Sequence, residues 1–317
     1  MTEILEIKNL QKFFEIKKGQ FLRAVDGISL SVRENEILGL VGESGCGKST
    51  LGRTLVGLYD KTSGEVLYRG EKLPESYSVA DFKRFSRDIQ MIFQDPYSSL
   101  NPRMTVKEIV AEGPMIHGLW NESEVASKVG SWLKKVGLSP DHMSRFPHEF
   151  SGGQRQRIGI ARALALKPKV IVCDEPISAL DVSVQAQIVN LLADLKTTMS
   201  LTLIFIAHDL SMVRYVSDRM AVMYLGTLVE LGPSNEVYFK PEHPYTQSLI
   251  ASNPEADPIK ERKRDHTVLK GEIPSALNLK GGCRFASRCP KAMDICRSKE
   301  PEWKKIGSEH YLACHLF

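Results

Sequence analysis

Short apolar runs alternate along the chain with longer segments whose apolar residues recur at helical spacing. The runs at 88–94 (DIQMIFQ), 170–176 (VIVCDEP) and 201–208 (LTLIFIAH) have the length and apolar character of buried strands. Between the last two runs, apolar residues fall on one face of a helix at Val184, Ile188, Leu191, Leu192 and Leu195. Strands that alternate with helices in this way predict an α/β fold with a mostly parallel sheet.

Two other parts of the chain have the pattern of antiparallel strands. Residues 4–14 and 24–32 alternate well enough to be strands, and a short basic loop joins them. We expect this pair to form an antiparallel β edge. Residues 220–232 predict a hairpin that turns at Gly226.

The pattern also divides the chain into regions. Residues 105–145 are mostly helical, and the apolar stripe around Trp132 predicts the core of a helical insertion subdomain that spans about residues 95–165. A polar, charged, proline-bearing stretch follows residue 254. We therefore expect a nucleotide-binding domain over 1–254 and a small, Cys-rich C-terminal domain over 255–317.

The composition is that of a soluble globular chain, with 42% hydrophobic and 25% charged residues. No window approaches the ~18 consecutive apolar residues of a membrane-spanning helix. The N-terminus lacks the basic start and long apolar core of a secretory signal, so we expect a cytoplasmic protein. Residues 259–317 hold 13 Lys and Arg against 7 Asp and Glu. This basic tail is either a solvated face or a contact with anionic lipid, nucleic acid or an acidic partner.

A glycine-rich octet follows an apolar run and precedes a helical segment. It matches G-x-x-x-x-G-K-[ST], in which the glycines let several backbone N–H groups point at one polyphosphate. Lys48 then lies along the β- and γ-phosphates, Ser49 offers its hydroxyl to Mg²⁺, and Thr50 starts a helix whose dipole favours the anion. A Gly-rich turn with a surface lysine is the alternative. The residues expected to contact the nucleotide here are Gly42, Glu43, Ser44, Gly45, Cys46, Gly47, Lys48, Ser49 and Thr50.

Polar side chains end the apolar runs. Asp174 and Glu175 end one run, as they must if one carboxylate is to hold Mg²⁺ and the next is to polarise a water in line with the γ-phosphate. His208, at the end of another run, is a candidate to hydrogen-bond the γ-phosphate and this water. Gln94 ends the third run, and we assign it to the catalytic set and to Mg²⁺. Structural acids and ordinary polar strand ends would look similar.

The adenine base has two candidate partners, Phe13 and Phe14, in the first predicted strand. One member of an adjacent pair in an alternating strand must face the core. The other ring is then available to stack on adenine, and we favour Phe14 for this role.

Together these motifs resemble the ATP-binding cassette (ABC) ATPases over about residues 3–252. The resemblance rests on the order GESGCGKS, Gln94, SGGQ, VIVCDEP, SALD and His208, in which SGGQ is the specific part. It implies an ABC-type P-loop ATPase with a mostly parallel core sheet, an antiparallel β edge, a helical insertion subdomain, and ATP and Mg²⁺ as cofactors.

The same resemblance assigns a second set of residues to a neighbouring cassette. In this family ATP is sandwiched between two cassettes, and the signature motif of one contacts the γ-phosphate bound to the other. The signature residues are Ser151, Gly152, Gly153 and Gln154. Asp181 is expected to help organise the interface. Phe150 stands where the family usually has Leu, which exchanges one bulky side chain for another.

The C-terminal segments HPYTQSLI, GEIPSALN and GCRFASRCPKAMDICRSKEPEW look like those of dipeptide/oligopeptide permease ATPases. The stretches HEFSGGQRQRIGIARAL and SALDVSVQAQI look like the F-type member of such ATPase pairs. The resemblance implies a peripheral subunit on the cytoplasmic face of the membrane that powers peptide import. Its implied partners are a second, non-identical ABC ATPase, two transmembrane permease subunits and, indirectly, an extracytoplasmic peptide-binding protein, with no nucleic acid. The helical insertion would receive a coupling helix from the permease subunits, with Gln94 as the hinge.

Three alternatives stay open. Nickel permease ATPases are close relatives, so nickel or another small solute is an alternative cargo. Soluble cassette proteins that act on ribosomes or DNA usually carry two cassettes or a long coiled coil, and neither feature is present here. The third alternative is a regulatory metal-binding module in which the Cys-rich tail is the functional part, and the intact catalytic set argues against this as the whole function.

Four cysteines crowd the last 35 residues with the spacing C-x₅-C-x₆-C-x₁₇-C, at Cys283, Cys289, Cys296 and Cys314. In a cytosolic chain such a cluster suggests metal before disulfide. Four thiolates suit zinc or iron–sulfur, but structural zinc sites favour ligand pairs about two to four residues apart. We therefore expect one [4Fe–4S] cluster, which the family resemblance also implies, with Zn²⁺ or unliganded thiols as alternatives. His310 and His315 are possible substitutes for a cysteine.

Overall fold

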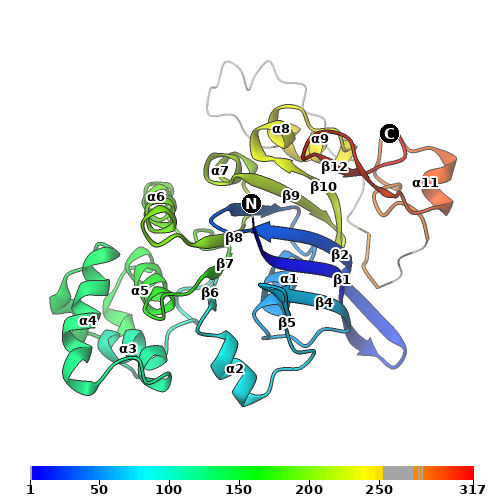
Figure 1. Ribbon diagram of the computed structural model, residues 1–317. Helices are drawn as coiled ribbons and strands as arrows, with labels where there is room; N and C mark the ends of the chain where they lie inside the picture. Colours follow the sequence, from blue (N-terminus) through cyan, green and yellow to red (C-terminus); the bar gives the residue numbers. More distant parts are fainter. Residues whose placement is uncertain (1, 253–273, 278, 280) are drawn as a thin grey trace, which may run out of the picture. The chain divides into compact units, whose positions relative to one another are not determined.

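The computed structural model describes residues 2–252, 274–277, 279 and 281–317 (Figure 1). Contacts within the chain divide it into two compact units. The first unit joins Met1–Glu75 to Ala207–Phe317, and the second is Ser76–Ile206. The predicted boundary after residue 254 falls outside the described residues, so a separate C-terminal domain stays a prediction.

The first unit contains a four-stranded antiparallel sheet in the order β2-β1-β4-β5. Its strands are β1 (Glu3–Lys17), β2 (Gln20–Arg33), β4 (Ser63–Tyr68) and β5 (Glu71–Lys72). The register sets Leu5 opposite Val32 and Ile7 opposite Leu30, so that buried apolar residues face one another across the hairpin. This arrangement confirms the predicted antiparallel pair.

A second group of strands in the first unit follows the order β11-β12-β10-β9-β3. They are β3 (Ile37–Val41), β9 (Arg219–Tyr224), β10 (Thr227–Pro233), β11 (Trp303–Lys305) and β12 (Tyr311–Ala313). β3 and β9 are parallel, and the other pairs are antiparallel. The turn at Gly226 between β9 and β10 confirms the predicted hairpin. The C-terminal segment thus contributes two strands, although its sequence looks loop-like.

Five described helices accompany these strands: α1 (Lys48–Leu55), α7 (Leu210–Val216), α8 (Ser234–Phe239), α9 (Pro244–Ala251) and α11 (Asp294–Ser298). The helix α7 packs closely on β3, because a Cβ atom on Gly39 would lie 2.2 Å from Cγ1 of Val213. The helix α9 begins with Pro244. Proline is favourable there because the first N–H groups of a helix have no partner within the helix, so its missing N–H costs no hydrogen bond.

The second unit is built on three parallel strands. They are β6 (Ile89–Ile92), β7 (Val170–Asp174) and β8 (Thr202–Ile206), with β7 between the other two. Every residue of β7 and β8 is buried, as expected for strands of a parallel sheet covered on both faces. The helices α2 (Val79–Phe85), α5 (Gly152–Leu164) and α6 (Val182–Met199) belong to the same unit.

A helical region lies between β6 and α5 in the sequence and is drawn in green in Figure 1. It comprises α3 (Val106–Ile116), α4 (Glu122–Lys135) and the short 3₁₀ turns η1 (Pro140–Ser144) and η2 (Pro147–Glu149). Trp132 is buried together with Val129 and Leu133, which confirms that this stripe belongs to the core. Among the described residues, no helix is both long and apolar enough to cross a membrane.

Candidate active site

The phosphate loop links the end of β3 to the first residue of α1, which confirms the predicted strand, loop and helix. Its backbone is packed so closely that side chains are excluded at two positions. A Cβ atom on Gly42 would lie 2.3 Å from the carbonyl oxygen of Met223, and one on Gly47 would lie 1.9 Å from that of Ala24. Both glycines also have positive φ, at 151° and 106°. The backbone of the loop therefore packs directly against β2 and β9.

Lys48 is buried and spans this loop. Its Nζ donates to the carbonyl oxygens of Gly42 at 2.8 Å and Glu43 at 3.0 Å. Within the loop, Cys46 is buried, and desolvation raises the pKa of its thiol, which keeps it neutral near pH 7. Ser44 and Gly45 are exposed, and Ser49 and Thr50 stand in the first turn of α1.

The two aromatic candidates for adenine do not behave as the alternation of the strand predicts. Phe13 and Phe14 are both half-buried, so neither faces the core, because shifts in the β1–β2 register interrupt the alternation there. The ring of Phe14 contacts Tyr59 edge-on, with centroids 5.3 Å apart, and Lys12 Nζ lies 4.8 Å from its centroid. Tyr59 follows α1 outside any periodic pattern, so the sequence alone does not indicate it.

In the second unit, two parallel strands deliver Gln94 and Glu175 to the same place. Gln94 follows β6 and Glu175 follows the neighbouring β7, and Gln94 Nε2 donates to Glu175 Oε2 at 2.8 Å. Glu175 has φ of 43°, and its N–H donates to the carbonyl of Ile206 at 3.0 Å. Asp174, the last residue of β7, is fully buried. This unit thus holds a carboxylate and an amide at hydrogen-bond distance.

The signature motif begins α5, as its serine and glycines predict. Ser151 is the N-cap: its Oγ accepts the N–H of Gln154 at 3.4 Å, and its own N–H donates to Gln154 Oε1 at 3.0 Å. Gly153 packs tightly, because a Cβ atom there would lie 2.5 Å from Cγ1 of Val184 in α6. Ser151 itself is exposed, and Gly152, Gly153 and Gln154 are half-buried.

Two further predicted residues are exposed. Asp181 holds the N-cap position of α6 in the second unit. His208 comes two residues after the end of β8 and belongs to the first unit. Both side chains are accessible to a ligand or a partner chain.

The four C-terminal cysteines lie near one another, since the charge of other members of the set raises the pKa of each of Cys283, Cys289 and Cys314. Burial raises the pKa of Cys283 to about 11 and also raises the pKa values of Cys289 and Cys314. The sulfur atoms of these three accept a hydrogen bond from the N–H two residues further on, in Phe285, Lys291 and Leu316 respectively. Over the described part of the chain, no three His, Cys, Asp or Glu side chains could hold a metal ion as they stand.

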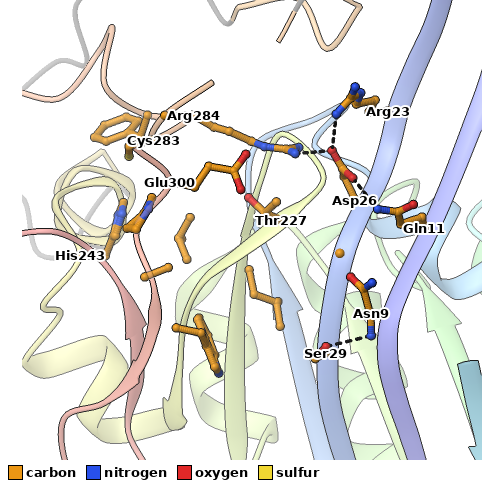
Figure 2. A pocket seen from close by; sticks show the side chains of 18 residues that line it. Asn9, Gln11, Arg23, Asp26, Ser29, Thr227, His243, Cys283, Arg284 and Glu300 are labelled. Atoms are coloured by element: carbon orange, nitrogen blue, oxygen red, sulfur yellow. Dashed lines mark hydrogen bonds and ion pairs between the residues drawn. The ribbon is translucent and has the colours of Figure 1, made fainter. Parts of the chain in front are cut away.

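A polar cleft of about 510 Å³ lies in the first unit beside this Cys-rich segment (Figure 2). Its lining includes Asp26 from β2, to which Gln11 donates at 3.2 Å and Arg23 at 3.4 Å. Arg284, the residue after Cys283, also donates to Asp26. No residue of the phosphate loop lines this cleft, so it is distinct from the predicted nucleotide site.

Comparison with known proteins identifies two regions of the chain. Residues 25–178 match the ABC transporter family model, and residues 229–296 match the model for the oligopeptide/dipeptide transporter, C-terminal region. The oligopeptide transport ATP-binding protein AppF of Bacillus subtilis is 49% identical, with 99% of this chain and 97% of AppF covered. The oligopeptide transport ATP-binding protein OppF of Escherichia coli is 51% identical, with 94% and 92% covered.

A solved structure carries the same fold. It is the dimeric post-hydrolysis state of the ATP-binding cassette MJ0796 bound to ADP and Pi, with 28% identity and a TM-score of 0.66. The match covers 73% of this chain and 98% of that one.

Proposed function

Because the chain belongs to the family of ATP-binding subunits of oligopeptide and dipeptide ABC transporters, we propose that it binds and hydrolyses ATP to power the import of di- or oligopeptides. The match of residues 229–296 to the oligopeptide/dipeptide transporter model is the observation that favours peptide as cargo. An importer of nickel or another small solute is the alternative cargo assignment.

In the proposed reaction, Lys48 and the phosphate-loop N–H groups bind the β- and γ-phosphates. Glu175 accepts a proton from the water that attacks the γ-phosphorus, and Gln94 and His208 orient that water and the γ-phosphate. The hydrogen bond from Gln94 to Glu175 supports this pairing, because it fixes the carboxylate that serves as base. Phe14 is proposed to stack on adenine; its ring, like that of Phe13, is half-buried rather than enclosed in the core.

The donor set fits Mg²⁺, since a hydroxyl, an amide oxygen and a carboxylate are hard oxygen ligands. Ser49, Gln94 and Asp174 are the proposed ligands. When bound, the ion would neutralise charge on the phosphate oxygens. Asp174 suits this role because it is the last residue of β7, directly before the proposed base Glu175.

A second, non-identical cassette is proposed to complete the site. The signature residues Ser151, Gly152 and Gly153 would then contact the γ-phosphate bound by the partner, with Asp181 at the interface. The exposure of Ser151 and Asp181 supports this proposal, because both are accessible to another chain. It follows that one cassette alone would be a poor ATPase.

Two transmembrane permease subunits are proposed to dock on the helical region, which would hold the protein at the cytoplasmic face of the membrane. An extracytoplasmic peptide-binding protein would act indirectly through them. A groove of about 550 Å³ between α3 and α4 supports this assignment. Half of its lining residues are apolar (Met104, Ala111, Met115 and Val125) and half are charged (Lys107, Glu108, Glu112 and Glu122). Ile116 beside it is 62% exposed. Such apolar side chains suit an amphipathic coupling helix.

The Cys-rich segment is proposed to bind one [4Fe–4S] cluster. Burial raises the pKa values of three of its four thiols, and backbone hydrogen bonds to those sulfurs partly offset this effect and are of the kind that tunes iron–sulfur centres. The spacing C-x₅-C-x₆-C-x₁₇-C favours this cluster over zinc, because structural zinc sites usually have ligand pairs about two to four residues apart. Its role would be structural, because a small segment gains folding free energy from bound metal.

Reconstitution in vesicles tests the proposed function. The chain is combined with a second cassette, permease subunits and a binding protein of a peptide transporter from the same organism, and uptake of labelled peptide and of ⁶³Ni is measured with ATP inside or outside. ATP-dependent peptide uptake that fails with Glu175→Gln supports the proposal. Nickel uptake without peptide uptake would move the assignment to the alternative cargo.

A further inference from the structure

The loop between Cys283 and Cys289 carries two arginines. Arg288 contacts the phosphate loop itself, and Arg284 contacts residues that are hydrogen-bonded to it. Arg288 donates from both terminal nitrogens to the carboxylate of Glu43, at 2.7 and 2.9 Å. The side chain of Arg288 is only 6% exposed and that of Glu43 20%. A two-pronged arginine–carboxylate pair with so little exposure is both directional and weakly screened by salt. It fixes the orientation of the Glu43 side chain.

Glu43 is also held through its backbone. It is the second residue of the phosphate-loop octet, and its N–H donates to the hydroxyl of Tyr245 at 2.8 Å. Tyr245 is fully buried and packs on Phe285, with ring centroids 5.3 Å apart. Phe285 lies in the same cysteine loop as Arg288. The loop therefore supports Glu43 from its side chain and, through Tyr245, from its peptide.

The second arginine supports the middle of the phosphate loop, at Cys46. Arg284 donates to the carboxylate of Asp26 and to the carbonyl oxygen of Leu225, as Figure 2 shows for Asp26. The N–H of Asp26 donates to the carbonyl of Gly226 at 2.8 Å, and the N–H of Gly226 donates to the carbonyl of Cys46 at 2.8 Å. A continuous chain of hydrogen bonds thus runs from the cysteine loop to Cys46.

We propose that the loop from Cys283 to Cys289 is a latch that holds the phosphate loop in its ATP-binding conformation, with Arg288 as the main positioning residue. The inference rests on the proposed function as an ATP-binding subunit. A glycine-rich loop has many accessible conformations, and ordering its N–H groups around a polyphosphate costs conformational entropy. Contacts that order the loop beforehand strengthen binding by reducing that cost.

The latch predicts a specific loss of nucleotide affinity. In the full-length chain, Arg288→Gln is expected to raise the Kd for MgATP about tenfold, because it removes the two-pronged pair while keeping the loop sequence otherwise intact. Amide exchange in the peptide that covers residues 42–49 should become faster. Arg288→Lys should recover only part of the affinity, since an ammonium group cannot donate in the same planar fork.

Two controls separate the latch from general effects. Arg297→Gln removes the same charge from an exposed position in the same segment, and it should leave the Kd unchanged. Glu43→Gln should weaken binding like Arg288→Gln, and the double variant should bind no more weakly than either single variant, because both act through one contact. Thermal unfolding of each variant shows whether it is folded. If Arg288→Gln does not fold, Glu43→Gln provides the test in its place.

The outcomes are distinguishable from failure of the proposed function. If the natural chain does not bind MgATP, or if Lys48→Ala binds it equally well, the proposed function fails. If the natural chain binds MgATP but folded Arg288→Gln and Glu43→Gln bind it with the same Kd, the latch is overturned. Additive losses in the double variant would also overturn it, because independent effects exclude a shared contact.

Discussion

Replacing His310 should destabilise the protein in a pH-dependent way. His310 Nε2 lies 2.8 Å from Oε1 of Glu230, whose side chain is fully buried, and His310 itself is 8% exposed. Glu230 keeps two other hydrogen bonds, from the N–H groups of Glu242 at 2.9 Å and His243 at 3.1 Å. His310→Phe therefore removes one of three donors to a buried carboxylate and adds no new polar group.

The size of the effect follows from this geometry. A hydrogen bond to a charged group contributes about 1.5–3 kcal/mol, whereas leaving a buried charge with no partner costs about 3–5 kcal/mol. Because two donors remain at Glu230, we expect His310→Phe to lower the free energy of unfolding by about 2 kcal/mol at pH 6. His148→Phe, at an exposed histidine, should change it by less than about 0.5 kcal/mol.

The pH dependence has a definite sign. The hydrogen bond to Glu230 raises the pKa of His310, so the folded chain binds this proton more tightly than the unfolded chain. The contribution of the charged form is complete below the unfolded pKa of about 6.5 and is lost as pH rises through the raised pKa of the folded state. Urea unfolding followed by circular dichroism should show a smaller difference between His310→Phe and the natural chain at pH 9 than at pH 6. An equal difference at both pH values would refute the assignment of a charged pair.

Three other predictions concern the proposed function. Glu175→Gln should bind MgATP with near-natural affinity but hydrolyse it about 10²–10⁴-fold more slowly in the assembled transporter, because it loses the general base; full turnover would exclude this base. The chain alone should hydrolyse ATP slowly and become active with a second, non-identical cassette and the permease pair, and rapid hydrolysis by a strictly monomeric preparation would contradict the shared site. Anaerobically purified protein should contain four iron atoms per chain and absorb at about 400 nm, as expected of thiolate-bound iron–sulfur centres as a class. A metal content of one zinc and no iron would exclude the cluster.

The sequence predicts those parts of the fold that depend on local periodicity. The short apolar run from Val170 to Cys173, which is followed by two acidic residues, indicates a buried strand, and the serine and glycines before Ile158 mark the start of α5 at Gly152. The phosphate loop was predictable for the same reason, because its glycines satisfy a local steric requirement at Gly42 and Gly47. In each case the neighbours in sequence carry the information.

Other features depend on contacts between distant residues and leave no periodic signal. Tyr59 packs on Phe14 although neither position belongs to an apolar pattern that pairs them. The register shifts in the β1–β2 hairpin overturn the alternation from which one buried phenylalanine was predicted. Residues 311–313 form a strand by pairing with the edge strand β10. The position of that edge is a property of the folded sheet, so the three residues alone do not predict the strand.

The C-terminal segment contacts the rest of the first unit through several chemically different interactions. β12 pairs with β10 through backbone hydrogen bonds, His310 contacts the buried Glu230, and Arg288 contacts Glu43 across 245 residues of sequence. Removing the segment would leave Glu230 without one of its hydrogen-bond donors and Glu43 without the guanidinium of Arg288. In a truncated chain, the effect of losing the cysteines could therefore not be separated from the effect of losing contacts to the phosphate loop. Substitutions such as Arg288→Gln, which break one attachment at a time, therefore separate a structural role of the cysteines from an effect on ATP binding, and truncation cannot.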